Sequence, residues 1–133
     1  MKIMSVVGTR PNFVKEALMN VQLKKEGIEE ILVHTGQHYD YNMSSDFFST
    51  FDIPEPDIFL EVSGMDSLKF MSTCIDKLSA SVKNIVPDLI LSYGDVNTTT
   101  CSALVSSISD IPFIHVESGV RSKLLYNPEE INR

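Results

Sequence analysis

Two carboxylates stand at positions suited to proton transfer. Asp95 comes two residues after the apolar run Leu89–Tyr93, and Glu117 comes directly after the apolar run Phe113–Val116. Both runs are typical of buried strands, and side chains just beyond such strands lie at the ligand-binding edge of a parallel sheet. Two carboxylates that are neighbours at this edge can differ in pKa, so that one acts as a base and the other as an acid. The alternative is structural: Asp95 caps the next helix, and Glu117 pairs with Arg121.

A cationic turn precedes these carboxylates in the chain. Gly8-Thr9-Arg10-Pro11 joins the first apolar run to an amphipathic segment, and Lys15 follows one helical turn later. Backbone N–H groups at the start of a helix, the Arg10 guanidinium and the Lys15 ammonium could therefore converge on an anion such as a phosphate. The turn lacks the glycine patterns of a dinucleotide-binding loop and of a P-loop, so those two kinds of site are disfavoured. Alternatively, Arg10 caps the helix and Lys15 is a solvated surface residue.

Polar side chains also follow the second apolar run, in the segment 37–40 with the sequence Gln-His-Tyr-Asp. They extend the same edge of the expected sheet. His38 and Asp40 could be metal ligands, but no third ligand stands at a recognisable spacing, so we expect no metal site. His34 and His115 lie within apolar runs, where a histidine with satisfied hydrogen bonds in the core or at an interface is the favoured interpretation.

Nucleophilic catalysis of the hydrolase type has no support in the sequence. No Gly-x-Ser-x-Gly pattern occurs. Cys74 and Cys101 stand far apart among apolar neighbours, without the spacing of a zinc site or of a redox pair. We therefore expect two reduced thiols packed in or near the core.

The pattern of apolar residues predicts alternating strands and helices. Strands are expected at 3–7, 30–35, 59–62, 89–93 and 113–116, and helices over 11–23, 41–51, 68–86, 97–108 and from residue 128. Glu129 and Glu130 would then lie in a first helical turn, where the helix dipole alone favours carboxylates. Because the strands are apolar throughout and alternate with helices, we expect an α/β fold: a three-layer Rossmann-like domain with a doubly wound parallel sheet. No repeat or linker divides residues 1–133, so a single domain is expected.

Composition narrows the class of partner. The 133 residues are 43% hydrophobic, enough for one core, and carry a formal charge of −7 without a Lys/Arg cluster. This argues against a nucleic-acid partner, which needs an extended basic surface. Neither a signal-peptide pattern nor an apolar segment of membrane-spanning length is found, so we expect a cytoplasmic protein without a membrane partner.

Five segments together resemble one family. In this order and spacing they are similar to the UDP-N-acetylglucosamine 2-epimerases: Gly8-Thr9-Arg10-Pro11 with Lys15, residues 35–40, Tyr93-Gly94-Asp95, residues 115–122 and residues 128–133. No single segment is specific, but five ordered matches along the chain are hard to reach by coincidence. The chain departs from the family pattern at Ser118, where alanine is usual, and at Val96, where threonine is usual.

The resemblance implies a two-domain enzyme of the GT-B type. Residues 1–133 would supply its amino-terminal half, without the carboxy-terminal nucleotide-binding domain and a further catalytic histidine. Such enzymes interconvert UDP-N-acetylglucosamine and UDP-N-acetylmannosamine: the C2 proton is removed, UDP leaves to give 2-acetamidoglucal, and UDP is added back after reprotonation on the other face. The resemblance implies a homodimer for the full-length enzyme and no cofactor. The 133 residues alone are expected to be inactive.

By motif position, the resemblance assigns catalytic roles to Asp95, Glu117 and Glu129. It assigns substrate binding to Arg10, Lys15, Gln37, His38 and Arg121. The segment at residues 37–38 also resembles a region that binds a second UDP-N-acetylglucosamine as an activator in some bacterial members. No arginine stands in residues 62–69 to complete that region, so activation of this kind is not expected. Two alternatives stay open: a hydrolysing 2-epimerase that releases UDP and N-acetylmannosamine, and a non-catalytic remnant that binds a nucleotide sugar.

Overall fold

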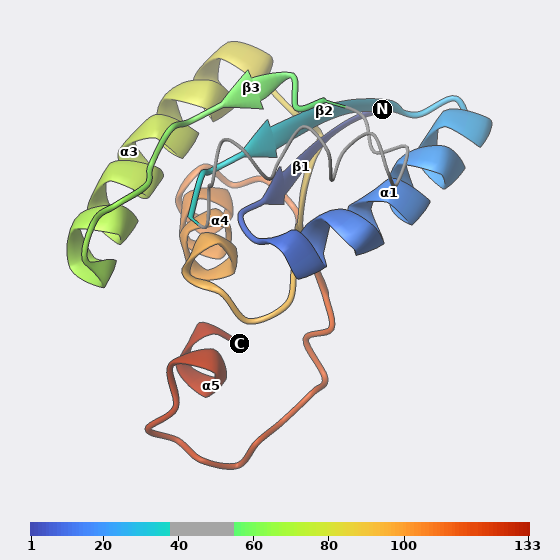
Figure 1. Ribbon diagram of the computed structural model, residues 1–133. Coiled ribbons are helices and arrows are strands. Elements are labelled where there is room, and N and C mark those ends of the chain that lie inside the picture. Colours follow the sequence, from blue (N-terminus) through green and yellow to red (C-terminus); the bar gives the residue numbers. More distant parts are fainter. Residues whose placement is uncertain (38–54) are drawn as a thin grey trace.

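The computed structural model describes residues 1–37 and 55–133 of the chain (Figure 1). Strands and helices alternate along these residues, as the apolar pattern predicts. In chain order they are β1 (Lys2–Val7), α1 (Arg10–Lys25), β2 (Glu29–His34), β3 (Ile58–Phe59), α3 (Ser67–Ile85), β4 (Leu89–Tyr93), α4 (Asn97–Ile108), β5 (Phe113–Val116) and α5 (Pro128–Asn132). The helix predicted over 41–51 lies outside the described residues.

The strands form one parallel sheet in the order β3-β2-β1-β4-β5. In the central strand β1, Val6 lies opposite Val33 of β2 on one side and Ser92 of β4 on the other. The chain runs outward from β1 to β3 and then returns to β4 on the far side of β1, which confirms the predicted doubly wound α/β class. The carboxyl ends of β1 and β4 are therefore neighbours at the switch point, where sheets of this kind bind ligands.

The strand β3 is shorter than predicted. Residues 59–62 were expected to be extended, whereas the strand comprises Ile58–Phe59. Glu61 has a φ of 53°, in the left-handed region, which interrupts the extended backbone. Leu60 and Val62 still donate backbone hydrogen bonds to the end of β2, at 2.9 and 2.8 Å. The segment therefore runs beside β2 beyond the end of β3.

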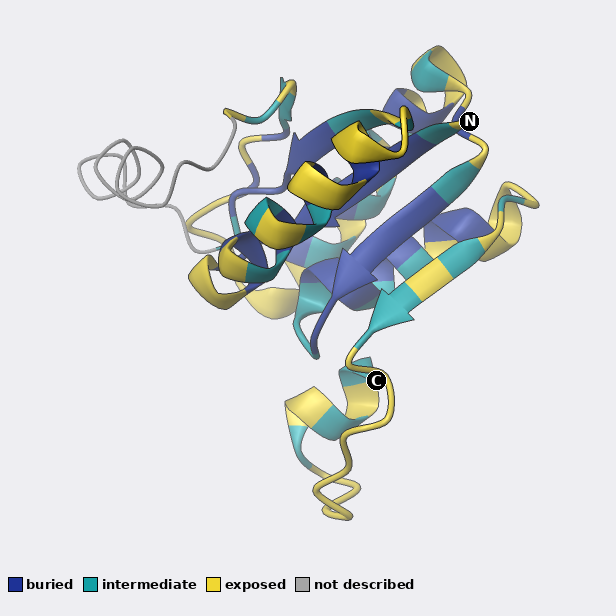
Figure 2. Ribbon diagram, turned by 90° about the vertical axis from the view of Figure 1, so that its right-hand side faces the viewer, coloured by how far each residue is buried: buried dark blue, intermediate teal, exposed yellow. Residues whose placement is uncertain are grey.

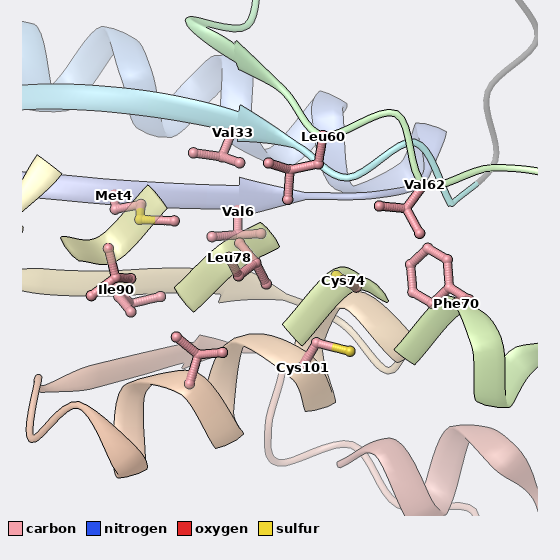
Figure 3. Close-up of a cluster of buried hydrophobic side chains, with 12 residues drawn as sticks. Met4, Val6, Val33, Leu60, Val62, Phe70, Cys74, Leu78, Ile90 and Cys101 are labelled. Carbon is pink, nitrogen blue, oxygen red and sulfur yellow. The ribbon is translucent and has the colours of Figure 1, made fainter. Parts of the chain in front are cut away.

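Helices cover both faces of the sheet, so the described residues form three layers (Figure 1). On the face of α3 and α4, a buried cluster is formed by Met4, Val6, Val33, Leu60, Val62, Phe70, Cys74, Leu78, Val82, Ile90, Cys101 and Val105 (Figure 3). On the face of α1, the buried cluster is Ile3, Val7, Phe13, Leu23, Leu32, Leu91 and Tyr93. Neighbouring residues of each central strand alternate between the two clusters, as the two-residue period of a strand requires. Figure 2 shows these strands buried between helices with exposed outer surfaces.

The orientation of α1 differs from the one that its apolar residues suggest. Three of these apolar side chains are exposed to solvent: Val14, Leu18 and Val21. Leu18 is the most exposed of the three, at 71%. Three polar residues spaced four apart are buried instead: Asn12, Glu16 and Asn20. Residues at this spacing lie on one face of a helix. The face of α1 toward the sheet therefore combines Phe13 and Leu23 with a polar stripe, and this stripe contacts the residues of the site.

Candidate active site

The carboxyl ends of β1, β4 and β5 bring the cationic turn and Glu117 to the same edge of the sheet. Lys15 Nζ on α1 forms an ion pair and hydrogen bond with Glu117 Oε2, directly after β5. Asn12 Nδ2, one turn earlier on α1, donates to the carbonyl of Tyr93 at 3.2 Å. Lys15 is therefore paired, and the carboxylate of Glu117 contacts Lys15 instead of Arg121. Both structural alternatives that the sequence left open for these two residues are wrong.

Backbone geometry places the Glu117 carboxylate against the turn after β4. Glu117 has a φ of 71°, a left-handed conformation that costs a non-glycine residue about 1–2 kcal/mol. Gly94 has a φ of 69°, and a Cβ atom there would lie 3.7 Å from Glu117 Oε2 and 3.4 Å from Asn12 Nδ2. Gly94 thus leaves room for these two side chains close to the backbone. Strained backbone of this kind is concentrated at functional sites.

The turn after β4 is fixed by hydrogen bonds from three elements. The carbonyl of Tyr93 accepts from Asn12 on α1 and from Thr99 Oγ1 on α4, the latter at 2.8 Å. The carbonyl of Gly94 accepts from His115 Nε2 on β5. His115 is therefore a histidine with a satisfied hydrogen bond, as predicted. These bonds fix the backbone immediately before Asp95.

Asp95 is held in place by the end of α5. Its carboxylate forms an ion pair with Arg133 Nη2, and the side chains are 27% and 11% exposed. Asn132 Nδ2 donates to the carbonyl of Asp95 at 3.0 Å and to Asn97 Oδ1 at 3.1 Å. The cap position of α4 is Val96, so Asp95 is not its N-cap. Sequence reasoning missed Asn132 and Arg133 as site residues, and the one signal for them was their place in the segment 128–133.

Gln37 caps α4 from the end of β2. Its Oε1 accepts from the backbone N–H of Thr98 at 3.1 Å and from Thr98 Oγ1 at 2.9 Å. Thr98 Oγ1 also contacts Thr35 Oγ1 at 2.9 Å, and a Cβ atom at Gly8 would lie 2.1 Å from Thr98 Oγ1. Gln37 thus lies at the predicted ligand-binding edge of the sheet, and its side-chain oxygen accepts hydrogen bonds from the first turn of α4. His38, the other predicted ligand in this segment, lies outside the described residues, as does Asp40.

The loop between β5 and α5 carries the other predicted residues. Arg121 donates to two carbonyls of its own loop and lies 3.9 Å from Glu130 Oε1. Glu130 Oε2 accepts from the N–H and the hydroxyl of Ser122, at 2.8 and 2.9 Å, and lies 3.7 Å from Arg133. The Ser122 N–H is the main reason why the pKa of Glu130 is below its usual value. Glu129 is exposed on α5, and its side chain forms no hydrogen bond or ion pair with residues 1–37 and 55–133.

A buried polar network lies behind the turn after β4. Tyr93 donates its hydroxyl to Glu16 Oε2 on the buried face of α1. Glu30 on β2 accepts from Ser5 Oγ and from Asn20 Nδ2 beside this pair. Burial, with the hydrogen bond and the charge of Glu30, raises the pKa of Glu16 to about 9. Glu16 is therefore a neutral acid near pH 7 and acts in the core, not as a solvent-exposed carboxylate.

His34 is a core residue, as predicted. Its ring stacks between Phe13 on α1 and Phe59 on β3, with centroid distances of 4.8 and 4.5 Å. Burial lowers the pKa of His34 to about 4, so the ring is neutral near pH 7. An uncharged imidazole is suited to this aromatic stack.

The described part of the chain offers neither a metal centre nor a membrane span. No three His, Cys, Asp or Glu residues there come together in a way that could hold a metal ion. No described helix is both long enough and apolar enough to cross a membrane.

Residues 21–133 match the model of the family described as UDP-N-acetylglucosamine 2-epimerase. The chain belongs to this family. Over its whole length it is 42% identical to a UDP-N-acetylglucosamine 2-epimerase homolog of Methanococcus maripaludis and 37% identical to the UDP-2,3-diacetamido-2,3-dideoxy-D-glucuronate 2-epimerase of Pseudomonas aeruginosa. It covers 37% and 38% of these two relatives. The chain thus spans a little over a third of the length of the curated relatives it matches.

Solved structures of the family have the same architecture. The crystal structure of the Methanocaldococcus jannaschii UDP-GlcNAc 2-epimerase in complex with UDP-GlcNAc and UDP matches all of this chain with a TM-score of 0.95 and 34% identity. The match covers 37% of that protein, its amino-terminal part. A Streptomyces glycosyltransferase complexed with thymidine diphosphate matches with a TM-score of 0.53 and 16% identity, which shows a shared fold alone.

Proposed function

We propose that this chain is the amino-terminal part of an epimerase that inverts C2 of a UDP-activated 2-acetamido sugar. The observation that carries the proposal is the placement of Asp95 and Glu117 at adjacent strand ends, with the Lys15 ammonium against Glu117. Family membership supports the choice of ligand, as do the UDP-GlcNAc and UDP in the complex of the M. jannaschii relative.

The charges at this edge suit an elimination and re-addition of UDP. Asp95 and Glu117 are the carboxylates that exchange the C2 proton, one on each face of the sugar, and Glu129 is the third carboxylate of the site. Arg10 and Lys15 stabilise the negative charge that develops on the diphosphate as the C1–O bond breaks. Arg121, Gln37 and His38 contribute to substrate binding. Loss of the proton and of UDP gives 2-acetamidoglucal, and reprotonation from the opposite face with return of UDP gives the epimer.

We further propose that residues 1–133 form one Rossmann-like domain and do not turn over substrate by themselves. The side chains of Lys15 and Glu117 are 34% and 42% exposed. Proton transfer at a weakly acidic C–H needs a site from which water is excluded. In the proposed full-length enzyme, a homodimer, a second domain closes this edge and contributes to binding of the uridine. Neither a metal nor an organic cofactor takes part in the proposed reaction.

Two sugars are candidates for the substrate. One is UDP-N-acetylglucosamine, and the other is the UDP-linked diacetamido glucuronate named for the Pseudomonas relative, which carries an additional carboxylate. The residues that bring Asp95, Glu117 and Lys15 together serve the chemistry at C1 and C2 that both sugars share. A non-catalytic nucleotide-sugar-binding chain is the alternative outcome.

Ligand mapping on the 133-residue chain tests this proposal. Two-dimensional ¹⁵N NMR is followed during titration with each of the two UDP sugars and, as a control, with the corresponding sugar without UDP. We expect shift changes at residues 8–15, at Gly94 and Asp95, and at Glu117, for the UDP sugars alone. Changes confined to the opposite end of the sheet, or equal changes with the sugar without UDP, would contradict the proposed site.

A further inference from the structure

The pairing of Lys15 creates a conflict between two anions. Lys15 Nζ contacts the Glu117 carboxylate. The proposed function requires the same ammonium to face the diphosphate of the substrate. A lysine ammonium is a compact charge on a flexible stem, and it can follow whichever anion binds it better.

We propose that the Glu117 carboxylate competes with a diphosphate for the Lys15 ammonium, and that an arriving diphosphate displaces the Glu117 carboxylate from it. This inference rests on the proposed function and adds a regulatory step to the same site. Displacement leaves the Glu117 carboxylate without its cation beside the bound substrate. The binding of the leaving group thereby prepares Glu117 to accept a proton.

Three features of the structure allow this exchange at low cost. Both side chains are about one-third or more exposed, at 34% and 42%, so the ion pair is weak and water can replace either partner. The left-handed backbone of Glu117 and the absence of a side chain at Gly94 keep the carboxylate at the edge after Lys15 has turned away. Lys15 lies on the turn of α1 that follows the helix N-terminus, whose own N–H groups favour an anion next to it.

Binding of inorganic pyrophosphate to the full 133-residue chain tests this competition directly. Affinities are measured by calorimetry at low ionic strength, where exposed charges are least screened. The proteins are the wild type, Glu117→Gln, Lys15→Met and the double variant. Asp76→Asn on the exposed side of α3 is the control. It removes one negative charge, as Glu117→Gln does, but at a residue that does not contact Lys15.

The inference predicts that Glu117→Gln binds pyrophosphate about two- to fivefold more tightly than the wild type, the factor expected for a half-exposed ion pair. The gain disappears in the Lys15→Met background, and Asp76→Asn binds like the wild type. The inference is overturned if Glu117→Gln binds no more tightly than the wild type, or if neither protein binds pyrophosphate. It is also overturned if the gain persists without Lys15, because removal of charge alone would then explain it. Incorporation of deuterium at C2 of the sugar reports on the proposed function separately, so each proposal can fail without the other.

Discussion

Tyr93, the last residue of β4, donates its hydroxyl to Glu16 on the buried face of α1. The bond connects the helix that carries Lys15 to the strand that leads to Asp95. This carboxyl group is buried and also lies beside Glu30, so the Tyr93 hydroxyl is one of two contacts that support it. The position of Lys15 relative to Asp95 therefore depends on a neutral glutamic acid in the core, Glu16.

The protonation of Glu16 makes stability depend on pH. Its pKa is about 9 in the folded chain and 4.5 in the usual reference state, so the folded chain holds a proton that the unfolded chain releases between these values. Stability from this group is complete below pH 4.5 and is lost as pH rises toward 9. Glutamine does not titrate, so Glu16→Gln does not lose stability in this way. Between pH 4.5 and 9, the free energy of unfolding of the wild type therefore falls relative to that of the variant, by at most about 1.4 kcal/mol per pH unit.

Urea unfolding at pH 5, 7 and 9 measures this difference. Glu26→Gln, an exposed residue at the end of α1, is the matched control and should follow the wild type at every pH. Parallel pH profiles for wild type and Glu16→Gln would show that Glu16 keeps an ordinary pKa in the folded chain.

Gly8 is required by the close approach of α4 to the end of β1. A Cβ atom at this position would lie 2.1 Å from Thr98 Oγ1 and 2.8 Å from Thr35 Oγ1. We expect Gly8→Ala to lower the free energy of unfolding by about 1–3 kcal/mol, because a packed interior cannot accept the added methyl group without strain. Gly119→Ala is the control, since nothing lies within 4 Å of its Cβ position. Equal stability of the two variants in urea unfolding would contradict this packing.

Asn132 attaches the end of the loop to α4 and to the turn at Asp95. Its side chain donates to the Asp95 carbonyl and to Asn97, and it accepts from Thr100 Oγ1 at 2.7 Å. Asn132→Ala should detach α5, and trypsin should then cleave after Lys123 severalfold faster than in the wild type. Asn84→Ala, exposed on α3, should leave the rate of cleavage unchanged. A cleavage rate in Asn132→Ala that equals that of the wild type would show that these bonds do not hold the loop.

Cys74 on α3 and Cys101 on α4 face each other in the core (Figure 3). The hydrogen bond between the two thiols and their burial raise the pKa of Cys74. Because both thiols are completely buried, the reagent cannot reach them, so both residues should resist alkylation by iodoacetamide in the folded chain and react fully in urea. Mass spectrometry after a timed exposure measures the modified fraction. Rapid modification under native conditions would mean that α3 and α4 separate readily.

The sequence was sufficient for the elements whose apolar pattern is local. The strands at 89–93 and 113–116 and the helix over 68–86 follow from short runs of residues, and the structure has them within one or two positions. The face of α1 that packs against the sheet was not predictable from its apolar residues. Val14 and Leu18 are hydrophobic like Phe13, but they are exposed to solvent whereas Phe13 is buried. The spacing of the polar residues of α1, four apart, was the available signal.

Pairings between distant residues could not be predicted from the sequence. Lys15 and Glu117 are 102 residues apart, and their contact depends on the order of β1, β4 and β5 in the sheet. The sequence placed both at the same edge but suggested Arg121, four residues away, as the partner of Glu117. The ion pair of Asp95 with Arg133 likewise depends on how the loop after β5 returns to α4, which no local pattern specifies.

Transfer of deuterium to C2 of the sugar tests the central claim most directly. Residues 1–133 replace the corresponding amino-terminal part of the M. jannaschii relative, which is 34% identical over this length, and the chimaera is incubated with UDP-N-acetylglucosamine in D2O. We predict UDP-N-acetylmannosamine with deuterium at C2, no deuterium with the 133-residue chain alone, and none with the Asp95→Asn chimaera. Free UDP with N-acetylmannosamine would identify the hydrolysing reaction instead. A folded chimaera that binds UDP but leaves C2 without deuterium would contradict the assignment of Asp95 and Glu117 as the residues that move the proton.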